Sequence, residues 1–164
     1  MNTSEYAARG LNASGEFLKM TVADMTDAEL LTRPCPSANH PLWQLGHLCS
    51  AERGISEQIK PGSMPELPAG FKERFENKKT NDVDDISKLA TKQELLDLFT
   101  KLRAATIAMV TTMSPADFDQ PAPESFKRMC QTVGDVVNLQ VTHVMMHVGQ
   151  FQVARRKVGK PVLF

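Results

Sequence analysis

The chain of 164 residues has the length of one domain that can bury a single hydrophobic core. Its 19 basic and 19 acidic side chains give no net charge, so the overall field that attracts nucleic acid is missing. No apolar run approaches the roughly 20 residues that span a bilayer, and the N-terminus does not resemble a signal peptide. The three cysteines follow no spacing pattern, which is typical of reduced thiols in a cytoplasm. We expect one cytoplasmic domain, residues 1–164, that binds neither nucleic acid nor membrane.

A first helix is predicted over residues 3–24, where apolar residues recur at helical spacing. Thr3 or Ser4 could cap its start. A short turn follows, and Thr26 with Glu29 three residues later has the spacing of a capping box.

A second helix is predicted over residues 41–59, because Pro41 suits a first helical turn and pushes His40 out of the helical region. The following stretch, residues 60–88, is rich in proline, glycine and charge, with a turn of helix expected near residues 71–77. Loops of this length are usually functional or mobile, and this one is expected to roof a pocket.

Two further helices complete the chain. Thr91 and Glu94 form a predicted capping box at the start of a helix over residues 91–113. The last helix is predicted over residues 132–158 and ends before Gly159. Four long helices without a convincing strand predict an all-α bundle.

Two of the four histidines lie four residues apart in the last predicted helix, in THVMMHVGQ. At about 100° per residue, His143 and His147 share one face, which is the spacing of two imidazoles that bind one metal ion. The rest of that face is mainly apolar, so both rings are predicted to point into the core. Its members are Val133, Val137, Gln140, Val144, Phe151 and Ala154.

A third histidine, His47, lies in PLWQLGHL of the second predicted helix. One aromatic and three small residues share its face, and the small ones would allow another helix to approach: Trp43, Ser50, Ala51 and Gly54. We expect His47 at the edge of the core-facing side, within reach of the histidine pair.

The three imidazoles have two interpretations. A single inward histidine is more often a hydrogen-bonded core residue than a ligand. However, two buried imidazoles need partners for four ring nitrogens, and a third completes the donor set of an open, catalytic metal site. We therefore expect His47, His143 and His147 to bind a divalent metal. A non-catalytic helical protein, a metal-binding or stress-response interaction module, is the alternative.

These motifs together resemble the DinB-like family (DinB/YfiT-like metalloenzymes). The resemblance rests on PLWQLGHL, the long loop, and a last helix reading VGDVVNLQVTHVMMHVGQFQVARRKVGKP, and it covers nearly the whole chain. It implies a four-helix bundle of up-down-down-up order, with the long loop between the second and third helices, and often a homodimer. A second apolar stripe on the last helix, Leu139, Met146 and Val153, would also suit a homodimer contact.

The resemblance also implies an activity. In such proteins three histidines hold a divalent metal, commonly nickel or zinc, and His47, His143 and His147 match them. Gln150 matches the family's glutamine, three residues after the last ligand. Relatives include transferases that join low-molecular-weight thiols to electrophiles, so a thiol S-transferase with a thiol cosubstrate is the first hypothesis. A hydrolase that uses a metal-bound water is the alternative.

Three side chains are candidates for the pocket around the metal. Gln140 and Gln150 flank the histidine pair, where an amide could fix an imidazole tautomer or contact substrate. Either could equally be a buried amide that satisfies backbone groups. Trp43, one turn before His47, could wall the pocket or pack in the core.

Other polar residues are expected to have different roles. Glu52 and Cys49 point about 140° and about 200° away from His47 around the helix, so neither is predicted to reach the metal. Glu52 is expected in an ion pair or in packing. Arg155 and Arg156 are expected to complement the dipole at the end of the last helix.

Overall fold

The structure is a computed structural model that describes residues 1–75 and 90–163. Within these residues it contains seven α-helices, one 3-10 turn and no strand beyond an isolated bridge between Pro121 and Thr132. None of the described helices is both long enough and apolar enough to cross a membrane. The predicted all-α fold is confirmed.

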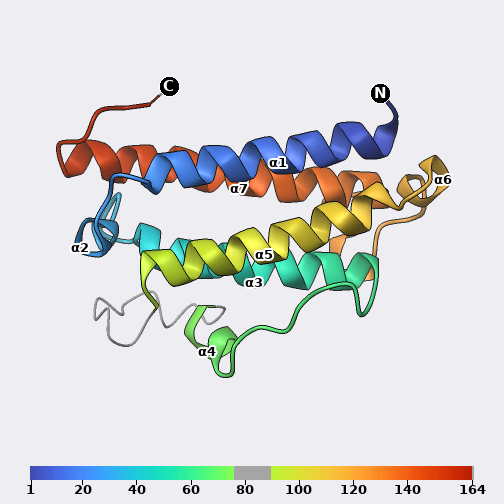
Figure 1. Cartoon of the computed structure of the whole chain (residues 1–164), viewed down its shortest axis with the longest axis horizontal. Coiled ribbons are helices and arrows are strands. Elements are labelled where there is room, and N and C mark those ends of the chain that lie inside the picture. Colours follow the sequence, from blue (N-terminus) through green and yellow to red (C-terminus); the bar gives the residue numbers. More distant parts are fainter. Residues whose placement is uncertain (76–89, 164) are drawn as a thin grey trace.

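Four long helices form the body of the molecule: α1 (Thr3–Val22), α3 (Pro41–Ile59), α5 (Lys92–Thr111) and α7 (Val133–Lys157). α1 packs beside α7 and α3 beside α5, while α1 against α5 and α3 against α7 close the bundle. In Figure 1, α1 and α7 run in one direction and α3 and α5 in the other. This is the predicted up-down-down-up order.

Short elements connect the long helices. They are α2 (Asp27–Leu30), α4 (Phe71–Phe75), α6 (Pro115–Phe118) and η3 (Glu124–Phe126). α2 links α1 to α3, and α6 and η3 lie at the far end between α5 and α7.

Capping side chains set the helix starts. Thr26 with Glu29 and Thr91 with Glu94 form the reciprocal capping boxes that their spacing predicts. The start of α1 differs from the prediction, because Asn2 rather than Thr3 or Ser4 is the N-cap. Its side chain accepts a hydrogen bond from the backbone N–H of Glu5, whose carboxylate accepts one from the N–H of Asn2.

The start of α3 fixes the fourth histidine in a structural role. His40 is itself the N-cap, and its Nδ1 accepts a hydrogen bond from the backbone N–H of Trp43 at 3.1 Å. Pro41 follows at the first helical position, where its missing N–H costs nothing. α3 therefore has the predicted bounds.

The connection after α3 packs on the outside of that helix. Phe75 of α4 lies so close to Gly46 that an added Cβ atom would be 2.1 Å from its ring, so only glycine fits at this position. The predicted turn of helix near residues 71–77 is present from Phe71 to Phe75. Residues 76–89 lie outside the described residues, so the roof over the pocket stays a prediction.

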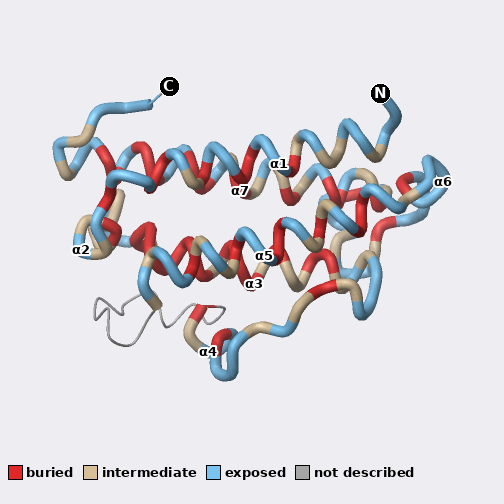
Figure 2. The backbone as a smooth tube through the Cα atoms, in the orientation of Figure 1, coloured by how far each residue is buried: buried red, intermediate tan, exposed pale blue. Residues whose placement is uncertain are grey.

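Buried side chains line the inner sides of the four long helices (Figure 2). The predicted inward face of α7, from Val133 to Ala154, is buried throughout at its apolar positions. Each fully buried large apolar side chain contributes about 1.5–3 kcal/mol. Along the second stripe of α7, Met146 and Val153 are exposed, whereas Leu139 packs partly against the core. The homodimer contact stays a prediction.

Candidate metal centre

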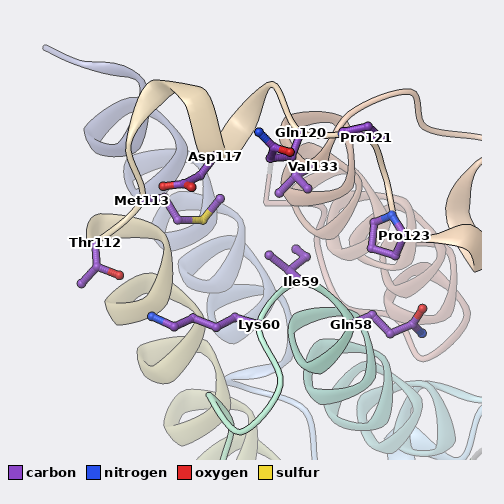
Figure 3. Close-up of a pocket in the computed structure, with 10 residues that line it drawn as sticks. All are labelled: Gln58, Ile59, Lys60, Thr112, Met113, Asp117, Gln120, Pro121, Pro123 and Val133. Carbon is purple, nitrogen blue, oxygen red and sulfur yellow. The ribbon is translucent and has the colours of Figure 1, made fainter.

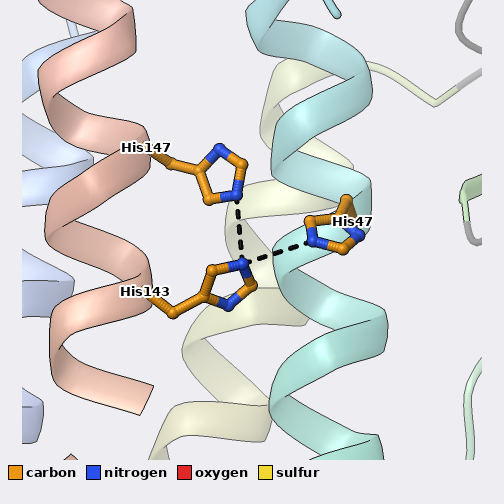
Figure 4. Close-up of side chains that lie close together, drawn as sticks. All are labelled: His47, His143 and His147. Atoms are coloured by element: carbon orange, nitrogen blue, oxygen red, sulfur yellow. Dashed lines mark hydrogen bonds between the residues drawn. The ribbon is translucent and has the colours of Figure 1, made fainter. Parts of the chain in front are cut away.

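The three predicted histidines converge in the described structure. Two neighbouring turns of α7 carry His143 and His147, and the antiparallel helix α3 places His47 opposite them (Figure 4). The Nε2 atom of His143 lies 3.3 Å from Nε2 of His47 and 3.1 Å from Nε2 of His147. All three potential ligand atoms lie within 4.8 Å of one another. The spacing within one helix predicts the pair, and the bundle supplies the third ring.

A hydrogen-bond chain on the far side of the cluster fixes the tautomer of His147. The carbonyl oxygen of Asn39 can only accept, so the Gln44 amide nitrogen donates to it at 2.6 Å. The amide oxygen of Gln44 then faces Nδ1 of His147 at 2.7 Å, and this nitrogen must carry the hydrogen. Nε2 of His147 consequently presents its lone pair to the other two rings.

Hydrogen bonds among the three rings cannot pair all three Nε2 atoms with one another. Because Nε2 of His147 has no hydrogen, only Nε2 of His143 can donate in that contact. If it does, its single N–H cannot also point directly at Nε2 of His47, which lies on another side at 3.3 Å. One shared cation would satisfy all three lone pairs at once.

The distances fit such a cation. Metal–nitrogen bonds of about 2.0–2.1 Å in tetrahedral geometry place the nitrogens about 3.4 Å apart. Two of the three separations, 3.1 and 3.3 Å, are close to that value, and all three ligand atoms lie within 4.8 Å of one another. In the described part of the chain the group consists of imidazoles alone, so the fourth position has no protein ligand. This donor set is that of an open site, and it suits several divalent metals.

The electrostatics favour the neutral, metal-binding form of two rings. Burial lowers the pKa of His143 to about 4 and that of His147 to about 3, and the neighbouring imidazoles add to the decrease. A hydrogen bond with Gln150 opposes the shift at His147. At neutral pH both rings therefore keep a free lone pair.

Trp43 contacts the cluster directly. Its ring stacks on the imidazole of His47 with centroids 5.3 Å apart and an angle of 6° between the planes. The side chain is also buried, so it both shields one face of His47 and packs in the core.

The two predicted glutamines take different positions. Gln140 is buried, but the hydrogen bond that it makes runs from the Ser56 hydroxyl to its amide oxygen at 3.3 Å. Gln150 is exposed at the edge of the cluster, and its hydrogen bond with His147 acts to raise the pKa of that ring. The amide that fixes the tautomer is Gln44, which the sequence argument missed because it considered only the faces of single helices.

Glu52 and Cys49 point away from the metal site, as predicted. Glu52 forms a buried ion pair with Arg103, with Nη2 and Oε2 2.9 Å apart. The thiol of Cys49 donates to the carbonyl of Leu95, and burial raises its pKa, so it stays protonated.

Arg155 stands in the last turn of α7, as predicted, but it has a further role. Its side chain is completely buried and donates to the carbonyl oxygen of Thr21 at 2.8 Å, while it also pairs with Asp24. It therefore caps the C-terminus of α1, and it also donates to the carbonyl oxygen of Pro161 just beyond its own helix. This is possible because α1 and α7 are parallel, so their C-termini lie at the same end. Arg156 is exposed in the last turn of α7, which suits the predicted dipole role.

Two hollows of the described surface differ in their relation to the imidazoles. A groove of about 250 Å³ on α3 begins at His47; we name it the α3 groove, and its lining is His47, Ser50, Ala51, Gly54, Ile55, Gln58 and Phe126. A larger cavity of about 510 Å³ lies near the ends of α3 and α5, and it contains none of the three imidazoles (Figure 3). The first hollow therefore adjoins the imidazole cluster and the second does not.

The small residues beside His47 differ in their surroundings. Ser50 is buried and Ala51 packs in a cluster with Val136 and Leu139 of α7, so a neighbouring helix does approach there. At Gly54 an added Cβ atom would meet nothing within 4 Å, so the helix is open at that position.

Comparison with known proteins agrees with the geometry. The model of the DinB superfamily matches residues 12–151, a span that includes all three clustered histidines. No curated protein matches the chain significantly.

Among solved structures, the chain is similar to YfiT from Bacillus subtilis, with a TM-score of 0.71 and 18% sequence identity over 96% of this chain and 89% of that one. YfiT is described as "a probable metal-dependent hydrolase with an unusual four-helix bundle topology". At this identity the similarity shows a shared fold. Since the family model covers most of the sequence, the chain belongs to the DinB superfamily.

Proposed function

We propose that the protein is a metal-dependent enzyme in which His47, His143 and His147 hold one divalent cation, nickel or zinc. The convergence of the three Nε2 atoms supports this proposal most strongly. When bound, such a cation lowers the pKa of a thiol or water at its open position, so that a nucleophile exists at neutral pH.

The residues around the cation have separate roles in this proposal. The three imidazoles bind and orient it, and Gln44 keeps a hydrogen on Nδ1 of His147 so that Nε2 stays free. Trp43 covers one face of His47 and excludes water from that side.

The proposed reaction is transfer of a low-molecular-weight thiol to a small electrophile. The thiol loses its proton to solvent, its sulfur forms a bond to the electrophilic carbon, and the leaving group departs with the electron pair of the broken bond. A thiol has a pKa of about 8.5, whereas that of water is about 15.7. The thiol therefore loses its proton with little help from the cation and without a separate base. This suits a site where, in the described part of the chain, no carboxylate joins the imidazoles.

Hydrolysis is the second candidate, because YfiT, a protein of similar fold, is described as a probable metal-dependent hydrolase. An open position on a cation held by three imidazoles also admits water as the nucleophile. Metal-loaded protein tested with a thiol plus a haloalkyl electrophile, and separately with activated esters and amides, distinguishes the two reactions.

Elemental metal analysis of untagged protein tests the site itself. We expect close to one nickel or zinc ion per chain, and a sharp loss in each of His47→Ala, His143→Ala and His147→Ala. His40→Asn is the matched control, since it removes the fourth histidine but keeps a capping side chain, and it should retain the metal. Folded native protein that takes up neither metal would overturn the proposal.

A further inference from the structure

The α3 groove starts at a residue of the metal centre and leads away from it. His47 belongs to both, and the lining residues of α3 continue to Gln58, about 16 Å further along the helix axis. Phe126 of η3 stands beside the groove, and the Ser125 hydroxyl donates to the Gln58 side-chain oxygen at the far end. The lining of the groove thus extends along α3 from a residue of the imidazole cluster.

The floor of the groove is open above small side chains. Ser50, Ala51 and Gly54 lie along the floor and have small side chains or none. Nothing lies within 4 Å of the place where Gly54 would carry a Cβ atom. A glycine in the middle of a helix destabilises it relative to alanine. Here neither a positive φ nor a close backbone contact requires that glycine. Space for a molecule that lies against the helix would account for glycine at this position.

One polar group at the floor has no partner. The Ser50 side chain is 3% exposed, and its hydroxyl makes no hydrogen bond among the described residues. The hydroxyl oxygen is itself buried, so Ser50 contributes a small side chain to the groove and no exposed hydrogen-bonding group.

The lining also indicates the charge of the occupant. Among the described residues, no carboxylate, lysine or arginine side chain lines the groove, whose members are aliphatic, aromatic, hydroxyl, amide and imidazole groups. Its volume of about 250 Å³ is below the range of whole drug-sized ligand sites, so it accommodates part of a small molecule.

We propose that the α3 groove is the subsite for the uncharged, elongated tail of the substrate whose reacting group occupies the metal centre. This inference rests on the proposed function. It adds that the substrate has a neutral tail along α3, which the three imidazoles alone do not specify.

Cobalt-loaded protein tests the subsite without knowledge of the natural substrate. The probes are mercaptoethanol, mercaptobutanol and mercaptohexanol, which share a thiol and a neutral hydroxyl end and differ in length. Their affinities are read from the visible spectrum of the cobalt ion. We expect affinity to rise about three- to fourfold for each added methylene that enters the groove. A mercaptocarboxylate of matching length should bind more weakly than the neutral probe.

Two glycine variants provide the matched comparison. Gly54→Leu places a large side chain in the groove and should remove the gain with chain length, while the affinity for mercaptoethanol and for cobalt stays unchanged. Gly149→Leu makes the same change on α7, where an added Cβ atom also meets nothing within 4 Å, and it should keep the gain.

The outcomes separate the two proposals. If cobalt and mercaptoethanol bind but affinity does not depend on chain length, or if Gly54→Leu keeps the dependence, the groove is not the subsite and the metal centre stands. If cobalt does not bind to the folded protein, both proposals fail.

Discussion

The interior of the bundle contains two clusters of polar side chains. They differ in how their polar atoms find partners. At one level, imidazoles from α3 and α7 direct their ring nitrogens to a common point. About a turn and a half further along α3, Glu52 pairs with Arg103 of α5, which also donates to the carbonyl oxygen of Leu11 in α1. The charges of the ion pair face each other inside the chain, whereas the imidazoles gather three rings of one kind around the same point. Buried polarity in this bundle is therefore of two kinds: an ion pair that joins helices, and a cluster whose donor set suits a cation.

The compensation of the ion pair is incomplete. Burial raises the pKa of Glu52, and the positive charge of Arg103 offsets this only in part. Oε1 of Glu52 and Nε of Arg103 have no hydrogen-bond partner among the described residues. The pair is thus costly to bury, and it stabilises the fold chiefly as long as both partners are present.

Removing one partner of the ion pair should have the largest effect on stability. Arg103→Met leaves the buried carboxylate of Glu52 without its counter-charge, and we expect a loss of about 3–5 kcal/mol in the free energy of unfolding. Urea denaturation measures it. The double variant Glu52→Gln with Arg103→Met should recover most of the loss, and the fraction of bound metal should not change in either folded variant. A single variant as stable as the native protein would show that the pair contributes nothing.

The second prediction concerns the amide that fixes the tautomer. Gln44→Met removes the acceptor for Nδ1–H of His147 while it keeps the volume of the side chain, and we expect metal affinity to fall about 10–100-fold. Competition with a coloured chelator measures the affinity.

Gln140→Met is the control for that variant. It changes another buried glutamine near the cluster, one bonded to Ser56 and to no imidazole, so it should lower stability without affecting metal affinity. Equal losses of affinity in the two variants would remove the special role of Gln44.

The smallest effect is a pH dependence of the metal-free protein. The pKa values of His143 and His147 are lowered in the folded state, to about 4 and about 3, so the unfolded chain binds protons that the native state does not. Stability should therefore decrease as pH falls from about 6.5 toward 4, with a slope of at most about 1.4 kcal/mol per pH unit from His147. The contribution of the more exposed His143 is smaller, because solvent screens it. Urea unfolding of chelator-treated protein across this range measures the slope, which His147→Gln should reduce; an unchanged slope would mean that the ring titrates normally.

Much of the bundle follows from local signals. Proline at a first turn, the capping boxes and the apolar spacing predict the helices well, because each of these signals acts within one or two turns. At the start of α1 three adjacent polar residues compete for the cap, and spacing alone does not show that Asn2 prevails.

The candidate site is less accessible to such reasoning. The helical spacing of His143 and His147 is visible in the sequence, but Gln44 meets its partner across 103 positions. The antiparallel register contains the missing signal: if His47 faces the pair, the residue about one turn before it faces the later ring of the pair. The role of Arg155 likewise depends on the parallel arrangement of α1 and α7, which lies outside any single-helix argument.

The direction of α3 and α5 has a further consequence for the chain that joins them. Neighbouring helices that run the same way oblige the connection to return along the full length of the bundle, about 28 Å for the 19 residues of α3. Even a fully extended chain needs about nine residues for that distance. The connection between α3 and α5 can therefore vary widely in composition but has a minimum length set by topology, and its length alone says nothing about what the protein binds.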